Sequence, residues 1–81
     1  MISSIVIVDD SRSIRGHVRR VLESAPEAFQ VIEHEDGLDA LRWLSTLSPS
    51  NLPDLILLDR NMPQITGDEC IRILKADSLW N

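Results

Sequence analysis

Three aspartates occupy positions at which their carboxylates can act together. Asp9 and Asp10 directly follow the β-branched run of residues 5–8. Asp59 directly follows the run of residues 54–58, which is apolar after its first residue. Runs of this kind are typical of strands that are buried on both faces of a parallel sheet. If the two strands are neighbours, they lie about 4.8 Å apart, and their carboxyl ends bring the three carboxylates into one acidic pocket.

This acidic pocket predicts a bound divalent cation. Like charges at short range disfavour each other's ionised forms, and a cation removes that conflict. Three oxygen ligands with room for water suit Mg²⁺, a hard ion that keeps part of its hydration shell. An aspartate beside such an ion can also attack phosphorus and form an acyl phosphate. The residues alone therefore predict an acidic Mg²⁺ site with phosphoryl chemistry, and they identify no substrate.

The elements that must position these aspartates alternate between strand and helix patterns. Strands are predicted at residues 5–8, 29–33 and 54–58, the second of them nearer a sheet edge because its sequence is mixed. This alternation predicts an α/β fold with a parallel sheet, and right-handed crossovers place helices on both of its faces. The helices are opened by Ser11, by Asp36-Gly37 with a leucine stripe that runs to Leu47, and by the capping box from Thr66 to Glu69.

The composition predicts one small, soluble, cytosolic domain. The 81 residues carry a formal net charge of -5, which argues against nucleic acid or another partner held through phosphate backbone contacts. Cys70 is the single cysteine, so no internal disulfide can form, as expected in the reducing cytosol. No apolar stretch of the sequence approaches the ~20 residues needed to cross a membrane.

Two motifs surround the aspartates. The first is Val8-Asp9-Asp10 after a strand, and the second runs from Asp59 to Gly67 with the form Asp, two residues, Met-Pro, three residues, Gly. Together they resemble the receiver domain of two-component response regulators, most closely the chemotaxis type. The resemblance implies a three-layer, flavodoxin-like, doubly wound parallel sheet with strand order 2-1-3-4-5. It also implies a phosphorylation switch that takes its phosphate from a histidine kinase or histidine phosphotransfer protein and is read out by an output domain or effector protein.

The resemblance assigns a role to each residue of the motifs. Asp59 is the phosphate acceptor, and Asp10 and Asp59 bind Mg²⁺ directly. The backbone carbonyl of Asn61 completes the protein ligands. Asp9 acts mostly through a metal-bound water, and Arg60 flanks the acceptor and influences access to it.

The family domain is longer than this chain, so residues 1–81 correspond to its N-terminal two-thirds, and the family's β4-α4-β5-α5 are absent. The Ser or Thr and the Lys with which the family contacts the phosphoryl oxygens cannot be placed on this sequence. We therefore expect the third strand to be an unpaired edge and one face of the first helix to be bare. We expect either that these residues are a fragment of the family domain, or that the chain pairs with another chain through that strand edge or that helix face.

Other functions remain open on the sequence alone. The first is a Mg²⁺-dependent phosphohydrolase with an aspartyl nucleophile, although the usual motif of that class has a second Asp where Asn61 stands. The second is a receiver-like interaction module that is never phosphorylated. In the plainest alternative, Asp9 and Asp10 only cap a helix and Asp59 begins a turn.

Several other residues that can carry chemistry have plainer predicted roles. His17 and His34 lack partners at metal-ligand spacing, which favours surface or packing roles. Cys70 is expected to be a small buried hydrophobe. Trp43 is expected in the core, whereas Trp80 is left uncovered where the chain stops. The arginine-rich stretch of the first helix is a solvated face or a patch for an acidic partner, and the resemblance adds docking of family kinases near this helix.

Overall fold

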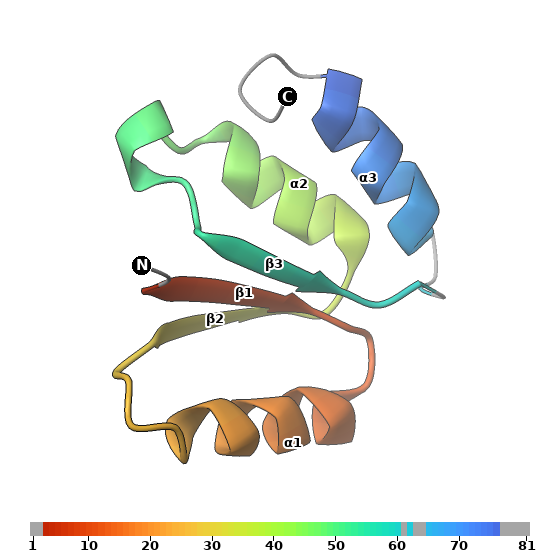
Figure 1. The fold of residues 1–81 in the computed structure, drawn as a ribbon. Coiled ribbons are helices and arrows are strands. Elements are labelled where there is room, and N and C mark those ends of the chain that lie inside the picture. Colours follow the sequence, from red (N-terminus) through yellow and green to blue (C-terminus); the bar gives the residue numbers. More distant parts are fainter. Residues whose placement is uncertain (1–2, 61, 63–64, 77–81) are drawn as a thin grey trace.

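Three parallel strands form the sheet, in the order β2-β1-β3 (Figure 1). The computed structural model describes residues 3–60, 62 and 65–76. In the register, Val8 lies opposite both His34 and Leu58, so the carboxyl ends of all three strands lie level at one edge of the sheet. This order confirms the first three positions, 2-1-3, of the predicted strand order 2-1-3-4-5. The strands are β1 (Ser4–Val8), β2 (Gln30–His34) and β3 (Leu55–Leu58).

The central strand β1 explains why its residues are apolar without alternation. Ile5, Val6, Ile7 and Val8 are each 2% exposed or less, because β1 is covered on both faces and paired on both edges. The third strand is an edge, as predicted, and its first residue Leu55 is 37% exposed.

Helices cover both faces of the sheet, as the crossovers predict (Figure 1). Helix α1 (Arg12–Glu23) lies on one face, and α2 (Gly37–Ser45) and α3 (Gly67–Ala76) lie on the other. A short 3-10 helix at Pro49–Asn51 interrupts the loop predicted at residues 48–53.

The helices begin where their caps predict. Ser11 Oγ accepts a hydrogen bond from the Ile14 amide, and Asp36 Oδ1 accepts one from the Asp39 amide. At the start of α3, the capping box is reciprocal, because the Glu69 amide donates to Thr66 Oγ1 and the Thr66 amide donates to Glu69 Oε1. Thr66 and Glu69 therefore have the structural role expected of them.

The predicted leucine stripe of the second helix was too long by two residues. Helix α2 ends at Ser45, and Leu47 lies beyond it. The amides of Thr46 and Leu47 donate to the carbonyls three residues earlier, at Trp43 and Leu44, so the chain tightens out of the α-helix there. The strand predicted at residues 29–33 lies one residue later at both ends, the strand predicted at 54–58 begins one residue later, and the strand predicted at 5–8 begins one residue earlier.

Asp54 lies just before β3 and joins its start to the start of β1. Its Oδ2 accepts hydrogen bonds from the amides of Ser3 and Ser4, at 2.8 and 3.0 Å. The bonds from Ser3 and Ser4 lower the pKa of this carboxyl below its ordinary value. This contact helps to fix the β1–β3 register at the end of the sheet opposite to the aspartates.

The main core lies between the sheet and helices α2 and α3. Helix α1 contributes no buried residue, and its Ile14 and Val21 are 50% and 56% exposed, which matches the bare face predicted for the first helix. Cys70 is 2% exposed, and burial raises the pKa of its thiol, so it is the small buried hydrophobe that was predicted. The buried cluster comprises Val6, Val8, Ala40, Met62, Ile65 and Cys70.

Gly37 lets α2 and α3 pack closely. A Cβ at this position would overlap Cys70 Sγ and lie 2.8 Å from Ile65 Cγ2. We expect Gly37→Ala to lower the free energy of unfolding by about 2 kcal/mol, since the core is overpacked. Urea unfolding of Gly37→Ala, Cys70→Ala and the double variant tests this. The double variant should lose less stability than the sum of the single losses, and simple additivity would contradict the contact.

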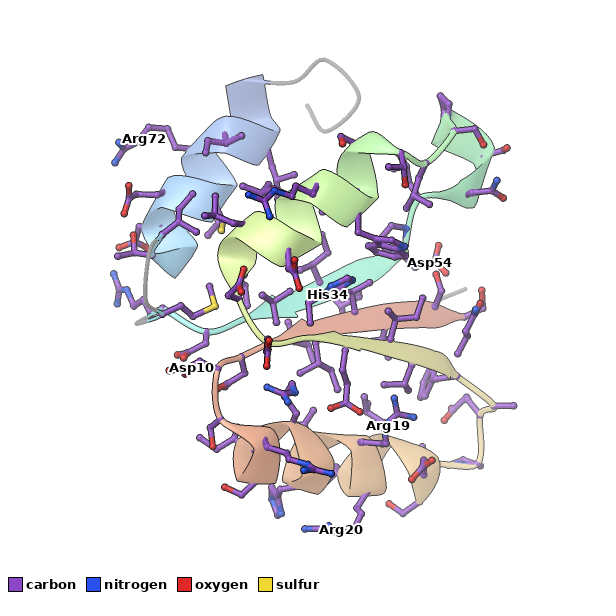
Figure 2. The ribbon with its side chains drawn as sticks, turned by 180° about the vertical axis from the view of Figure 1, so that it is seen from behind. Asp10, Arg19, Arg20, His34, Asp54 and Arg72 are labelled. Atoms are coloured by element: carbon purple, nitrogen blue, oxygen red, sulfur yellow. The ribbon has the colours of Figure 1, made fainter. Side chains whose placement is uncertain are left out.

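Arg15 and Arg19 of α1 both form ion pairs with the carboxylate of Glu33 on β2. Arg15 Nε donates to Glu33 Oε1 at 3.1 Å, and Arg19 Nε donates to Glu33 Oε2 at 2.7 Å. Figure 2 shows Arg19 between α1 and the sheet, whereas Arg20 points away from it. The hydrogen bond from Arg19 contributes most to lowering the pKa of Glu33, followed by the hydrogen bond from Arg15 and the positive charges of both arginines, and partial burial opposes them.

The Glu33 contacts predict a loss of stability in acid. Because the pKa of Glu33 is lower in the folded chain, its contribution is present above its unfolded pKa of about 4.3 and is lost as the pH falls through the folded value. We expect Glu33→Gln to cost roughly 1 kcal/mol at pH 7 and to flatten the acid side of the stability curve. Urea unfolding from pH 3 to 7 measures both effects, and equal curves for wild type and Glu33→Gln would contradict the prediction.

Candidate functional site

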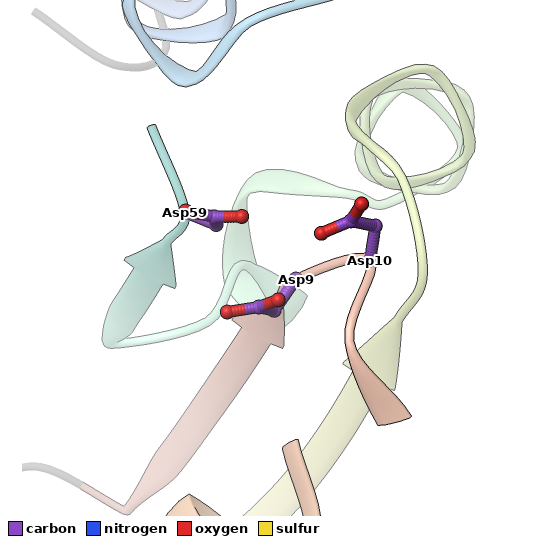
Figure 3. Close-up of side chains that lie close together, drawn as sticks. All are labelled: Asp9, Asp10 and Asp59. Carbon is purple, nitrogen blue, oxygen red and sulfur yellow. The ribbon is translucent and has the colours of Figure 1, made fainter. Parts of the chain in front are cut away.

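The three aspartates predicted to converge do so at the carboxyl edge of the sheet (Figure 3). One carboxylate oxygen from each of Asp9, Asp10 and Asp59 lies within 4.8 Å of the other two. Asp9 and Asp59 are half-buried, and Asp10 is exposed. The arrangement follows from the register, because Asp9 and Asp59 are the residues that come next after the paired ends of β1 and β3.

Backbone hydrogen bonds extend the sheet by one residue on each side of β1. The Asp59 amide donates to the Val8 carbonyl at 2.8 Å, and the Asp9 amide donates to the His34 carbonyl at 3.1 Å. The backbone at both aspartates is therefore set by strand pairing, which makes the spacing of their side chains a property of the fold.

The turn after Asp9 bears on the alternative that Asp9 and Asp10 only cap a helix. Asp9 Oδ1 accepts a hydrogen bond from the Ser11 amide at 2.9 Å, so this carboxylate does stabilise the local turn. The N-cap of α1 is Ser11, however, and not an aspartate. Capping therefore does not account for the approach of Asp10 and Asp59.

The chemistry of the three side chains suits a hard cation. All the ligand atoms in this cluster are carboxylate oxygens, and neither His nor Cys is among its members. Carboxylate oxygens together with water are the ligands that Mg²⁺ prefers in proteins. The fourth predicted ligand, Asn61, lies outside the described residues.

The backbone after Asp59 is held by the start of α3. The Gly67 amide donates to the Arg60 carbonyl at 3.0 Å, and a Cβ at Gly67 would overlap the carbonyl oxygen of Asp59. The spacing of the second motif is thus a packing requirement, which the sequence showed only as a pattern. The Arg60 side chain is 78% exposed, and its Nε lies 3.5 Å from Asp68 Oδ2. Its predicted influence on access to Asp59 stays a prediction.

The structure also brings together acidic residues that the sequence did not single out. Glu35, Asp36 and Asp39 have ligand atoms within 4.8 Å of one another at the start of α2. Asp36 is the N-cap of that helix, and its Oδ1 accepts a hydrogen bond from the Asp39 amide at 2.7 Å, so helix capping accounts for the place of Asp36 in this group.

The histidines and tryptophans behave mostly as predicted. His17 is exposed. His34 is the last residue of β2 and not a loop residue, because the strand continues one residue further than its pattern indicated. Its ring packs on Trp43 with centroids 5.0 Å apart, and Trp43 packs against the core. Trp80 lies outside the described residues.

Comparison with known proteins places the chain in a family. The model of the response regulator receiver domain matches residues 5–80. The chain belongs to this family. The predicted resemblance and the flavodoxin-like α/β fold are thereby confirmed, and the chain is a receiver domain of the two-component signalling type.

Individual relatives agree with the family match. The receiver domain is 40% identical over 70 residues to the transcriptional regulatory protein DegU of Brevibacillus brevis, covering 86% of this chain and 28% of DegU. It is similar to the Mn²⁺-bound form of the response regulator Rcp1, with 31% identity, a TM-score of 0.85 and coverage of 96% and 58% of the two chains. A phosphorylated cyanobacterial phytochrome response regulator, RcpA, is 28% identical, with a TM-score of 0.84 and coverage of 99% and 59%.

These relatives are longer than the receiver domain described here. The chain spans less than a third of DegU and less than two-thirds of the two similar structures. Among the described residues, no helix is both long and apolar enough to span a membrane.

Proposed function

We propose that Asp59 accepts a phosphoryl group from the phosphohistidine of a histidine kinase or histidine phosphotransfer protein, in a reaction that requires Mg²⁺. The observation that carries this proposal is the convergence of Asp9, Asp10 and Asp59 within 4.8 Å at the carboxyl edge of the sheet. The manganese-bound and phosphorylated relatives support it, since both are similar receiver structures.

In the proposed reaction, a carboxylate oxygen of Asp59 attacks phosphorus and forms a P–O bond. The P–N bond of the phosphohistidine breaks, and its electron pair stays on the departing imidazole nitrogen. When bound, Mg²⁺ neutralises negative charge on the transferring group. Asp10, Asp59 and the carbonyl of Asn61 would hold the ion directly, and Asp9 would hold one of its waters.

Asp59 is a better candidate for the acceptor than Asp9. Asp9 Oδ1 accepts a hydrogen bond from the Ser11 amide, which holds this side chain in the turn after β1. Asp59 begins the motif that ends at Gly67, and its backbone is fixed from both sides, by Val8 of β1 and by the start of α3. A fixed nucleophile favours in-line transfer.

The test is the intact mass of the protein before and after incubation with Mg²⁺ and acetyl phosphate, followed by peptide mapping of the adduct. We expect a gain of one phosphoryl group on Asp59 when Mg²⁺ is present, and no gain when Mg²⁺ is chelated before acetyl phosphate is added. A folded chain that binds Mg²⁺ and gains no adduct would overturn the proposal in favour of an unphosphorylated interaction module. Release of phosphate from a phosphomonoester over many turnovers would favour the phosphohydrolase instead.

Two further partners stay predictions: an output domain or effector protein, and a second copy bound at the β3 edge or the α1 face. A cytosolic location stays a prediction as well. The assignment of residues 1–81 to the first two-thirds of a longer receiver domain also stays a prediction.

A further inference from the structure

Arg15 joins the acidic site to the neighbouring strand. Its Nη1 donates a hydrogen bond to the carbonyl oxygen of Asp9, and its Nε donates to Glu33 Oε1 on β2. The Arg15 side chain is only 12% exposed, so water competes weakly for these two bonds. One guanidinium therefore connects α1, the turn after β1 and the second strand.

The carbonyl that Arg15 holds belongs to the peptide group between Asp9 and Asp10. A peptide group is planar, so fixing its oxygen also fixes the direction of the Asp10 amide and Cα. Two other contacts hold the residues on either side of Asp10: the Asp9 amide donates to the His34 carbonyl, and the Ser11 amide donates to Asp9 Oδ1. Of these contacts, the bond from Arg15 is the one made to the peptide group that joins Asp9 to Asp10, and the exposed Asp10 side chain follows the orientation of that peptide.

We propose that Arg15 is a positioning residue for the cation site. It holds the Asp9–Asp10 peptide in the orientation in which both carboxylates face Asp59. This role rests on the proposed function, because it assumes that the three aspartates hold Mg²⁺. Removal of a group that orients metal ligands typically weakens metal affinity by about 10- to 100-fold.

Arg19 offers a matched control on the same helix. It lies one turn later, and its Nε donates to the other oxygen of Glu33 at 2.7 Å. Its Nη2 donates to the Val31 carbonyl at 3.1 Å, near the start of β2 and therefore away from the acidic site at the carboxyl ends of the strands. Removing either arginine therefore breaks one Glu33 ion pair and one bond to a carbonyl, but only Arg15 touches the peptide between two predicted ligands.

The sign of the effect separates positioning from simple electrostatics. Loss of a positive charge near an acidic pocket favours cation binding, so charge alone predicts tighter Mg²⁺ binding in Arg15→Met. Loss of positioning predicts the opposite, because Asp10 is no longer held toward Asp59. Arg15→Lys keeps the charge, yet a single ammonium cannot reproduce the fork that reaches both Asp9 and Glu33.

The experiment is a calorimetric Mg²⁺ titration of wild type, Arg15→Met, Arg15→Lys and Arg19→Met, with urea unfolding of each. We expect the dissociation constant to rise roughly tenfold in Arg15→Met, less in Arg15→Lys, and not at all in Arg19→Met. Amide hydrogen exchange at Ser11 in the metal-free proteins is the second readout, and it should speed up only in the Arg15 variants.

Unchanged or tighter Mg²⁺ binding in Arg15→Met would overturn the positioning role, as would equal weakening in Arg19→Met. If Arg15→Met does not fold, the Mg²⁺ dissociation constants of Arg15→Lys and Arg19→Met are compared instead, and weaker binding in Arg15→Lys alone supports the positioning role. If wild type itself binds no Mg²⁺, the proposed cation site fails. In that case unchanged exchange at Ser11 in the Arg15 variants would also reject a role for Arg15 in ordering the turn.

Discussion

Replacement of Asp59 by Asn is expected to abolish phosphorylation of the receiver domain. The amide of Asn has no carboxylate oxygen that can form an acyl phosphate, although its size and its place at the end of β3 are preserved. The intact mass after incubation with acetyl phosphate and Mg²⁺ should therefore equal the mass before it. The expected loss of adduct is complete and not partial, because the nucleophile itself is removed.

The control for this result is Asp68→Asn. Asp68 is an exposed carboxylate close to the site, 3.5 Å from the Arg60 side chain, and it is not a member of the acidic cluster. An exposed ion pair of this kind contributes little to stability, so this variant should fold and gain a phosphoryl group like the wild type. An adduct that persists in Asp59→Asn, mapped to Asp9 or Asp10, would show that the acceptor has been assigned to the wrong carboxylate.

The convergence of the three aspartates could be predicted because it depends on few quantities. Each apolar run ends in a carboxylate, and parallel strands that start together also end together at one edge of the sheet. The pairing of Val8 with Leu58 puts Asp9 beside Asp59 without any further adjustment. Sequence therefore specifies this part of the site through strand length and strand order alone.

The contacts of Arg15 could not be predicted in the same way. A run of arginines on one helix shows which face is basic, but not how far each side chain reaches or which carbonyl it meets. Those depend on how α1 lies across β2, a packing geometry that no local pattern encodes. The same limit applies to the end of α2, where the leucine stripe continues to Leu47 but the backbone leaves the α-helix after Ser45. Periodicity describes which side chains face the core, and hydrogen bonds decide where a helix ends.

Gly67 lies at the closest approach between α3 and the site. A Cβ at this position would overlap the carbonyl oxygen of Asp59 and lie 2.9 Å from Arg60 Cα. Both neighbours are backbone atoms, which cannot move aside as a flexible side chain can. Relief of the overlap therefore requires that α3 move away or that the backbone after β3 be displaced together with Asp59.

Gly67→Ala is accordingly expected to lower the free energy of unfolding by about 3 kcal/mol, more than the loss expected at Gly37, where the neighbours are side chains. In the fraction that stays folded, phosphorylation by acetyl phosphate should slow by as much as about 100-fold, since a nucleophile displaced by about 1 Å loses its alignment. Gly16→Ala is the matched control. Its Cβ would have Arg20 Nη1 at 3.7 Å as its nearest neighbour, and alanine in a helix should raise stability by up to about 1 kcal/mol. Urea unfolding and the rate of adduct formation measure both variants. Wild-type stability and rate in Gly67→Ala would mean that the start of α3 does not hold Asp59 in place.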